Sequence, residues 1–420
     1  MNVTSGESLI RRLSWTERLF WLLDQNSPRH FVMAAQVDGH TSVDQWRAAL
    51  DAVQRRHPLL SAGIEVGDDG NPHFYRVAAA PIPLRVLRGG TLRCELEAEL
   101  ACELGLSFDP RRAPLIRAAL LYEPERATCI LSTHHSIADG RSIAFVFRDL
   151  LQALARTPLQ ALPVPPTVDD VVDRAAPGRP RQAGPTALDA VAPGRPARYR
   201  ARDGARPQVR TLQLAPELVD RLRHRAREEG TSLHGALCSG LALSFAELMD
   251  RPATEPVRIW SPMDVRKLLG LGDDCAVLAV SAIIPAVPDG PRGFWPAARA
   301  ITSRLAETNT VEYLADGLKL LSQNIGALDV TAAAQLMAQR FAFDFVVTNL
   351  GVLPYDTRFG NLRLEALWGP VVLSGFENEH VFGVTTADGR LALSYSSYTP
   401  MEPLLAVFEQ NLCAACAAEA

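Results

Sequence analysis

Two adjacent histidines and a carboxylate offer the clearest chemistry in this chain of 420 residues. His134 and His135 stand side by side, Asp139 follows four positions after the second histidine, and Gly140 comes next. A neutral imidazole with an ordinary pKa of about 6.5 can accept a proton at pH 7, which makes histidine a suitable general base. The chain has nine histidines in all, so an adjacent pair directly before such a turn draws attention to this stretch.

The pattern around these residues predicts a loop between a strand and a helix. Residues 128–133, TCILST, read as a short buried strand, and residues 142–154 have helical periodicity. Successive side chains along a strand point in opposite directions, so the two histidines cannot do the same job. One should face inward and bond to the scaffold, while the other can face a cleft. We expect Asp139 to curl back over the turn, and Gly140 to allow a positive φ or a close approach of backbone.

Four interpretations fit these residues. In the first, one histidine is the general base of an acyl transfer. In the second, the pair binds a metal ion. In the third, the pair lies at the edge of the core and has no catalytic or binding role. His134 and Asp139 also match the H-x4-D pattern of glycerolipid acyltransferases, although the membrane-associated apolar segments of those enzymes are missing. Adjacent histidines are poorly placed to ligate one ion, and no third histidine or cysteine follows nearby.

Composition divides the chain into two parts around a linker. Residues 162–207 are dominated by Pro, Ala, Gly and Arg, and apolar periodicity fades there. We therefore expect an N-terminal half over 1–161, a linker over 162–207 and a C-terminal half over 208–420.

Strands and helices alternate in both halves, which is an α/β pattern. In the first half we predict a strand at 30–39, a helix from Ser42 that ends at Pro58, and a helix at 91–104. In the second half the predicted strands are 208–214, 256–263, 361–367, 371–374, 380–386 and 391–397, with a hairpin turn at Asp388-Gly389. The predicted helices there are 216–228, a helix capped by Thr231 or Ser232, and a final helix at 403–417.

Charge and composition narrow the function classes. The net charge of −4 gives no electrostatic argument for a nucleic-acid partner. No basic, apolar leader and no uncharged apolar run of about 18 residues is present, so we expect a cytoplasmic protein without a membrane span. The seven scattered cysteines fit reduced thiols, and we interpret the isolated Cys413-x-x-Cys416 as packing rather than a metal site.

Residues 134–140, HHSIADG, match the HHxxxDG motif of the CoA-dependent acyltransferase superfamily. That superfamily includes chloramphenicol acetyltransferase, the condensation domains of nonribosomal peptide synthetases, plant BAHD acyltransferases, alcohol acetyltransferases and polyketide-associated mycobacterial acyltransferases. Four more segments resemble the family in the same order: LSWTERLFW at 13–21, RHPLL at 56–60, SPMDVR at 261–266 and VTNLG at 347–351. The DFGWG segment of BAHD enzymes has no clear match. The nearest resemblance is to the mycobacterial polyketide-associated group and to free-standing condensation-like enzymes.

The resemblance implies an α/β fold of two chloramphenicol-acetyltransferase-like halves, which form a V-shaped pseudodimer with a central channel. It implies that His135 is the catalytic base, that His134 is structural, and that Asp139 holds the loop through a salt bridge to Arg266. Backbone N–H groups near Gly140 would stabilise the oxyanion.

Other residues of the second half could line that channel. The family usually has Asn near His234, so His234 is either a packing residue or a residue that shapes the channel. By their place in the family pattern, Asn349, Trp368 and Ser374 are further candidates for the channel lining.

The function implied by the resemblance is transfer of an acyl group from a thioester to an acceptor hydroxyl, forming an ester, in polyketide, lipid or other secondary metabolism. The donor would be acyl-CoA or acyl-phosphopantetheine on a carrier protein supplied in trans, with a small-molecule acceptor and no tightly bound cofactor. We expect a monomer, because a chain with both halves completes its own site. The alternatives are an amide-forming condensation enzyme and a catalytically silent domain that recruits carrier proteins.

Overall fold

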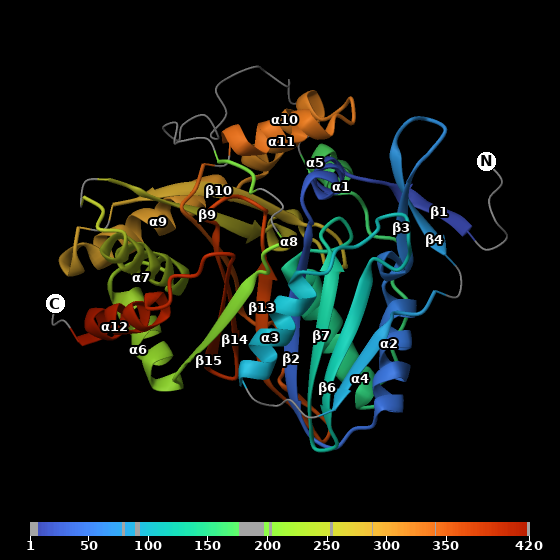
Figure 1. The fold of residues 1–420 in the computed structure, drawn as a ribbon, viewed down its shortest axis with the longest axis horizontal. Helices are drawn as coiled ribbons and strands as arrows, with labels where there is room; N and C mark the ends of the chain where they lie inside the picture. Colours follow the sequence, from blue (N-terminus) through green and yellow to red (C-terminus); the bar gives the residue numbers. More distant parts are fainter. Residues whose placement is uncertain are drawn as a thin grey trace.

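The protein contains two large β-sheets. The structure is a computed structural model that describes residues 7–77, 80–88, 93–175, 197–200, 204–252, 255–287, 289–340 and 342–417. Within those ranges the first sheet has the strand order β12-β13-β2-β7-β6-β5, and the second has the order β10-β9-β11-β14-β15-β8. A smaller sheet, β1-β4-β3, lies beside the first (Figure 1). The fold is therefore the mixed α/β, two-lobed arrangement that the resemblance implied.

The strands of the first lobe are β1 (Glu7–Arg12), β2 (His30–Asp38), β3 (Ala62–Val66), β4 (Pro72–Val77), β5 (Leu84–Arg88), β6 (Ile116–Glu123) and β7 (Arg126–His134). Those that follow in the chain are β8 (Gln208–Leu214), β9 (Val257–Asp264), β10 (Ala279–Ala286), β11 (Phe345–Val352), β12 (Arg358–Phe359), β13 (Leu362–Val372), β14 (His380–Ala387) and β15 (Arg390–Ser397).

The helices of the first part of the chain are α1 (Trp15–Asn26), α2 (Val43–Arg56), α3 (Arg93–Leu104), α4 (Gly140–Leu154) and α5 (Val168–Ala175). Those of the second part are α6 (Pro216–Glu228), α7 (Leu233–Leu248), α8 (Arg266–Leu269), α9 (Phe294–Thr308), α10 (Val311–Asn324), α11 (Val330–Arg340) and α12 (Leu404–Ala417).

Capping residues explain where several of the expected helices begin. Ser42 and Gln45 form a capping box at the start of α2, with reciprocal side-chain and backbone hydrogen bonds. Pro216 is the first residue of α6, and Ser232 caps α7 through the N–H of Gly235. These predicted helices are confirmed.

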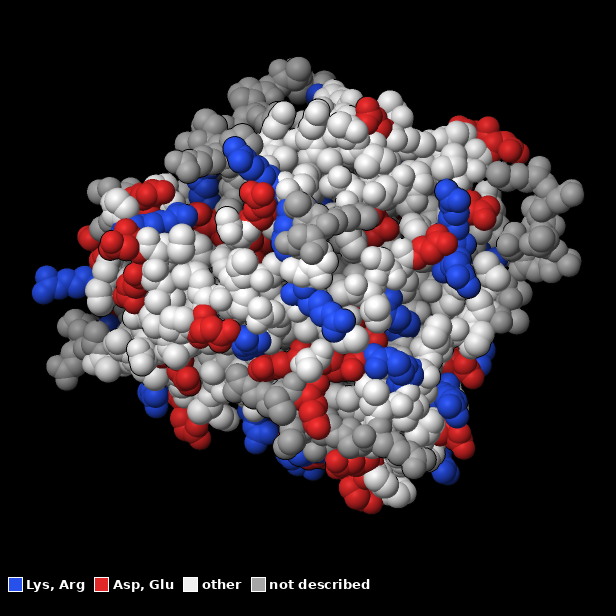
Figure 2. All heavy atoms as spheres, in the orientation of Figure 1, with Lys and Arg blue, Asp and Glu red and all other residues white. Residues whose placement is uncertain are grey.

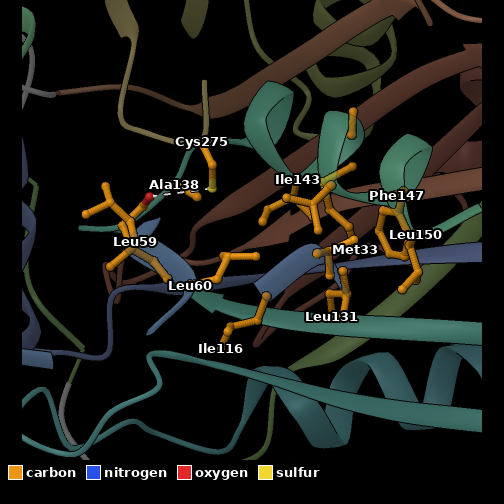
Figure 3. Close-up of a cluster of buried hydrophobic side chains, with 14 of the residues drawn as sticks. Met33, Leu59, Leu60, Ile116, Leu131, Ala138, Ile143, Phe147, Leu150 and Cys275 are labelled. Atoms are coloured by element: carbon orange, nitrogen blue, oxygen red, sulfur yellow. Dashed lines mark hydrogen bonds between the residues drawn. The ribbon is translucent and has the colours of Figure 1, made fainter. Parts of the chain in front are cut away.

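The core of the first lobe forms between α4 and the sheet. Ile143, Phe147 and Leu150 share one face of α4, and Figure 3 shows them pointing toward Met33 of β2 and Leu131 of β7. All five side chains are fully buried, so each removes apolar surface from water. This packing fixes the helix that directly follows the HHxxxDG segment.

A strand from late in the chain completes the first sheet. β13 pairs antiparallel with β2, with Leu367 opposite Ala35 and Val371 opposite Val32. The separate strands predicted at 361–367 and 371–374 are therefore wrong in their division, because one strand, Leu362–Val372, continues from the first into the second. Gly369 and Pro370 usually interrupt strands, but here a register shift between Trp368 and Val371 accommodates them.

The two lobes meet along a continuous apolar interface. Helix α3 packs against β2 of the first sheet and β8 of the second. Leu96 and Leu100 of this helix join one buried cluster with Val32 of β2 and Val209 of β8. The lobes are thus joined by this apolar packing and by β13, a strand of the second half of the chain that belongs to the first sheet.

Part of the expected linker is an ordered helix. Within the predicted 162–207 segment, α5 buries Val168, Val171 and Val172 and packs against α10 and α8. The helix was not predicted from the sequence, because its few apolar residues lie within a segment rich in Pro and Arg. Residues 176–196 and 201–203 of the predicted linker lie outside the described residues.

Candidate active site

His135 follows β7 directly, and its ring is held between aromatic side chains. The ring stacks on Phe20 of α1, with ring centroids 4.1 Å apart and planes within 9°. Phe31 of β2 lies on another side, with a centroid separation of 4.9 Å. The backbone N–H of His135 donates to the carbonyl of Arg29 at 2.8 Å. Burial lowers the pKa of His135 to about 4, with Asp139 opposing this shift, so the imidazole is neutral at pH 7.

His134 faces the scaffold, as strand alternation predicted. Its ring is fully buried, and Nδ1 accepts the backbone N–H of Ser136 at 3.1 Å. Nδ1 therefore carries no proton, which places the proton of the neutral ring on Nε2. Nε2 lies 3.5 Å from Oδ2 of Asp24. The two histidines thus have different surroundings, and only His135 reaches the cavity described below.

Asp139 and Arg266 form the ion pair that the resemblance implied. Oδ2 of Asp139 lies 3.0 Å from Nη1 of Arg266, and Oδ1 lies 3.2 Å from Nη2. Both side chains are at least 90 % buried. Burial alone would raise the pKa of Asp139, but Arg266 and backbone N–H donors hold that pKa below its ordinary value. The pair joins residues 127 positions apart.

Further hydrogen bonds fasten the histidine loop to the second half of the chain. Asp139 caps α4 through the N–H of Ser142 at 2.7 Å and also accepts the N–H of Leu278 at 2.8 Å. Oγ of Ser142 donates to the carbonyl of Ala276 at 2.7 Å. Asp139 therefore acts as a structural clamp between α4 and the segment before β10. In the core view, Cys275 of this segment lies beside Ala138 (Figure 3).

Gly140 is needed for close packing. A Cβ atom at this position would lie 2.5 Å from Cγ of Pro370 in β13. Of the two reasons expected for this glycine, close approach is confirmed, whereas its φ is not among the positive ones. The neighbour is a proline side chain rather than the backbone that the sequence suggested.

A cavity of about 240 Å³ lies in front of His135 and is lined from both halves of the chain. Phe20, Phe31, His135 and Gly140 line it from the first half. Most of the remaining wall is apolar and includes Leu19, Leu23, Leu314, Leu318, Leu321 and Met337. These leucines and the methionine come from α1, α10 and α11, which pack together at the top of the molecule (Figure 1).

The predicted channel residues divide into two pairs. Asn349 and Ser374 line the cavity. His234 stands behind Asn349, whose amide Nδ2 donates to His234 Nδ1 at 3.3 Å, and Nε2 of His234 lies 2.9 Å from Ser261 Oγ. Burial lowers the pKa of His234 to about 4.

Trp368 was expected to line the channel, but it lies outside the cavity wall. Its side chain is buried in the apolar interface between the lobes, where Nε1 donates to Oε1 of Gln36 at 2.8 Å. The alternation of β13 turns this indole toward the interface.

Sequence reasoning missed part of the cavity wall. Thr16, Leu19, Phe20 and Leu23 recur at helical spacing, so periodicity could have assigned them to one face of α1. That this face meets a histidine ring depends on the docking of the lobes. Arg29 also lines the cavity, and no motif marked it.

No metal cluster and no membrane helix is found in the described part of the chain. No group of three or more His, Cys, Asp or Glu side chains there could hold a metal ion. None of the described helices is long and apolar enough to cross a bilayer. On the face shown in Figure 2, acidic and basic side chains are interspersed.

Sequence comparison finds likeness to known proteins over part of this chain. A family model described as Condensation domain matches residues 14–182. The phosphinothricin tripeptide synthetase PhsC of Streptomyces viridochromogenes is 29 % identical over 152 residues, which are 34 % of this chain and 14 % of that protein. The chain spans between 2 and 14 % of the length of the curated relatives it matches.

Solved structures extend the likeness to nearly the whole chain. The first condensation domain of the CDA synthetase has a TM-score of 0.72 and 17 % identity, covering 97 % of this chain and 96 % of that one. Polyketide synthase associated protein 5 of Mycobacterium tuberculosis has a TM-score of 0.67 and 18 % identity, covering 98 % and 99 %. Residues 14–182 thus match the condensation-domain family, and the fold of nearly the whole chain is the one that condensation domains share with these solved structures.

The superfamily fold accommodates more than one chemistry. The trichothecene 15-O-acetyltransferase TRI3 of Fusarium sporotrichioides superposes with a TM-score of 0.72 at 11 % identity, covering 99 % of this chain and 96 % of that one. An epimerization domain of tyrocidine synthetase B and the X-domain from teicoplanin biosynthesis have the same fold. At such identities the likeness establishes the fold, so the reaction of this protein must be argued from its own site.

Proposed function

We propose that this protein transfers an acyl group from a thioester to an acceptor hydroxyl, with His135 as general base. The observation that carries the proposal is the neutral His135 ring, fixed between two aromatic side chains at a cavity shared by both halves. A base must be uncharged before it accepts a proton, and burial gives His135 that state at pH 7. The donor would be acyl-CoA or an acyl-phosphopantetheine carrier protein supplied in trans.

In this mechanism the acceptor oxygen attacks the thioester carbonyl while His135 takes its proton. The tetrahedral intermediate collapses, the carbon–sulfur bond breaks, and the proton on His135 passes to the departing thiolate. No covalent acyl-enzyme is required. Gly140 and Arg141 begin α4 and line the cavity, so the positive end of that helix would stabilise the oxyanion.

The other residues of the motif would act without touching substrate. His134 fixes the turn through Ser136, and Asp139 fixes it through Arg266 and Leu278. Such contacts hold the base within the narrow range of positions that efficient proton transfer needs.

The apolar part of the cavity favours an aliphatic acyl chain. Leu314, Leu318 and Leu321 of α10 face the space between α1 and α11 with no charged side chain among them. Each methylene that leaves water for such a wall contributes roughly 0.8 kcal/mol. We therefore include medium-chain acyl donors in the test.

The test is release of free thiol from acetyl-CoA, octanoyl-CoA and octanoyl-pantetheinyl carrier protein, with simple alcohols or amines present. His135→Ala should lower the acceptor-dependent rate by roughly 10²–10⁴-fold with the fold intact. His224→Ala is the matched control, because His224 is exposed on α6 and its ion-pair partner among the described residues is Glu228 of the same helix. Near-wild-type turnover of a folded His135→Ala variant would contradict the proposal.

The acceptor panel also separates the alternatives. Productive amines without productive alcohols would indicate the amide-forming enzyme. Absence of thiol release with every donor, together with measurable binding of the carrier protein, would indicate the recruiting domain.

A further inference from the structure

Arg29 is the cross-strand neighbour of His135. His30 pairs with His134 in the antiparallel β2–β7 ladder, and the N–H of His135 donates to the carbonyl of Arg29, which extends the ladder by one pair. Residues opposite each other in an antiparallel pair project from the same face of the sheet. Arg29 and His135 therefore enter the cavity side by side, and both line it.

The Arg29 guanidinium is buried, and one of its nitrogens has no partner. The residue is only 4 % exposed. Nη1 donates to the carbonyl of Ser374, whereas Nη2 is buried without a hydrogen-bond partner in the described part of the chain. The Tyr199 ring lies 6.0 Å from Cζ of Arg29, and its hydroxyl is also buried without a partner among the described residues. The Arg29 guanidinium thus brings an unfilled donor to the cavity wall, and Tyr199 lies beside it.

Nearby carboxylates do not form an ion pair with this guanidinium. Both oxygens of Glu379 accept backbone N–H groups of Ser374, Gly375 and Phe376, at 2.7–3.3 Å. Asp24 accepts the backbone N–H of Arg29 and lies against His134. Burial lowers the pKa of Arg29, while Tyr199 and Glu379 oppose this shift. A buried cation with an unfilled hydrogen-bond donor favours an anionic ligand.

We propose that Arg29 binds a carboxylate on the acceptor, which makes the acceptor a hydroxy acid. The carboxylate would fill the vacant Nη2 position, and the acceptor hydroxyl would then lie toward His135. A carboxylate fits better than a neutral carbonyl because it compensates the buried charge as well as the missing hydrogen bond. This inference rests on the proposed transfer reaction.

The experiment compares an acid with its neutral ester. With octanoyl-CoA as donor, kcat/KM is measured for 3-hydroxybutyrate and for methyl 3-hydroxybutyrate in wild type, Arg29→Gln and Arg29→Lys. Wild type should favour the acid by about tenfold or more, Arg29→Gln should abolish that ratio, and Arg29→Lys should retain part of it. Arg141→Gln is the matched control: Arg141 also lines the cavity, but its Nη2 already donates to Leu350, so the ratio should persist.

Calorimetric titration of 3-hydroxybutyrate without donor provides a readout that does not need turnover. Binding to wild type that is lost in a folded Arg29→Gln variant supports the subsite. Equal use of acid and ester by wild type, or an unchanged ratio in Arg29→Gln, overturns it while leaving the transfer reaction standing. Absence of transfer to every acceptor overturns the proposed function instead, and the titration then decides the subsite separately.

Discussion

At the scale of single residues, the pattern HHxxxDG indicated which positions matter, and the structure supplies their surroundings. The sequence distinguished an inward from an outward histidine, because alternation along a strand is a local rule. It could not show that Phe20 stacks on His135, since that contact joins residues 115 positions apart across separate elements. It also gave no sign of Arg29, whose position depends on strand register.

The stacked, partly buried ring of His135 has a consequence for the pH dependence of catalysis. His135 has its pKa lowered to about 4 by burial, so it loses its ability to accept a proton only as the pH falls through about 4. We expect kcat/KM of the wild type to show its acidic limb well below pH 6.5. Phe20→Ala admits water to the ring and should move that limb upward. An acidic limb near pH 6.5 in the wild type would contradict the burial described here.

At the scale of secondary-structure elements, α4 is held at its first turn by the second half of the chain. The helix itself was predictable from its apolar face, and its cap residue belongs to the motif. The clamp was implied by resemblance rather than by any local pattern, because Arg266 lies far away in the sequence. The strand β13 escaped correct prediction because Gly369 and Pro370 hide its continuity.

Asp139→Asn tests this clamp. The change removes the charge opposite a buried Arg266 and should lower the free energy of unfolding by roughly 3–5 kcal/mol. Asp38→Asn is the control, since it breaks an ion pair of 2.8 Å with the half-exposed Arg126 and should cost less than about 1 kcal/mol. Urea denaturation measures both. Similar losses in the two variants would show that Asp139 is no stronger a clamp than a surface pair.

At the scale of the whole molecule, burial of ionisable groups links stability to pH. Four buried or partly buried histidines, His30, His135, His234 and His380, have their pKa lowered to about 4 by burial. Between pH 6.5 and 4 the unfolded chain binds more protons at these sites than the folded chain does, so stability falls as the pH falls through that window. Asp169, Asp274 and Glu379 act in the opposite direction, because burial raises the pKa of each carboxyl group, that of Asp169 to about 7.

We therefore expect the free energy of unfolding to decline between pH 7 and pH 4.5, because the four histidines outweigh these carboxyl groups. Denaturant midpoints at several pH values within that range measure the slope. His380→Gln removes one of the four groups and should reduce the slope, whatever it does to stability at pH 7. A stability that rises toward pH 4.5 would mean that the histidines are hydrated in the folded protein.

The position of β13 in the first sheet affects how the protein folds during its synthesis on the ribosome. β2 is synthesised early, yet the strand that covers its outer edge ends at Val372, so more than 300 residues must follow before the sheet is complete. At ordinary rates of translation this interval is on the order of tens of seconds. During that time a nascent chain presents an apolar strand edge, the kind of surface that aggregates or recruits chaperones. Production of this protein in a foreign host should therefore depend more on translation speed and chaperone supply than its composition suggests.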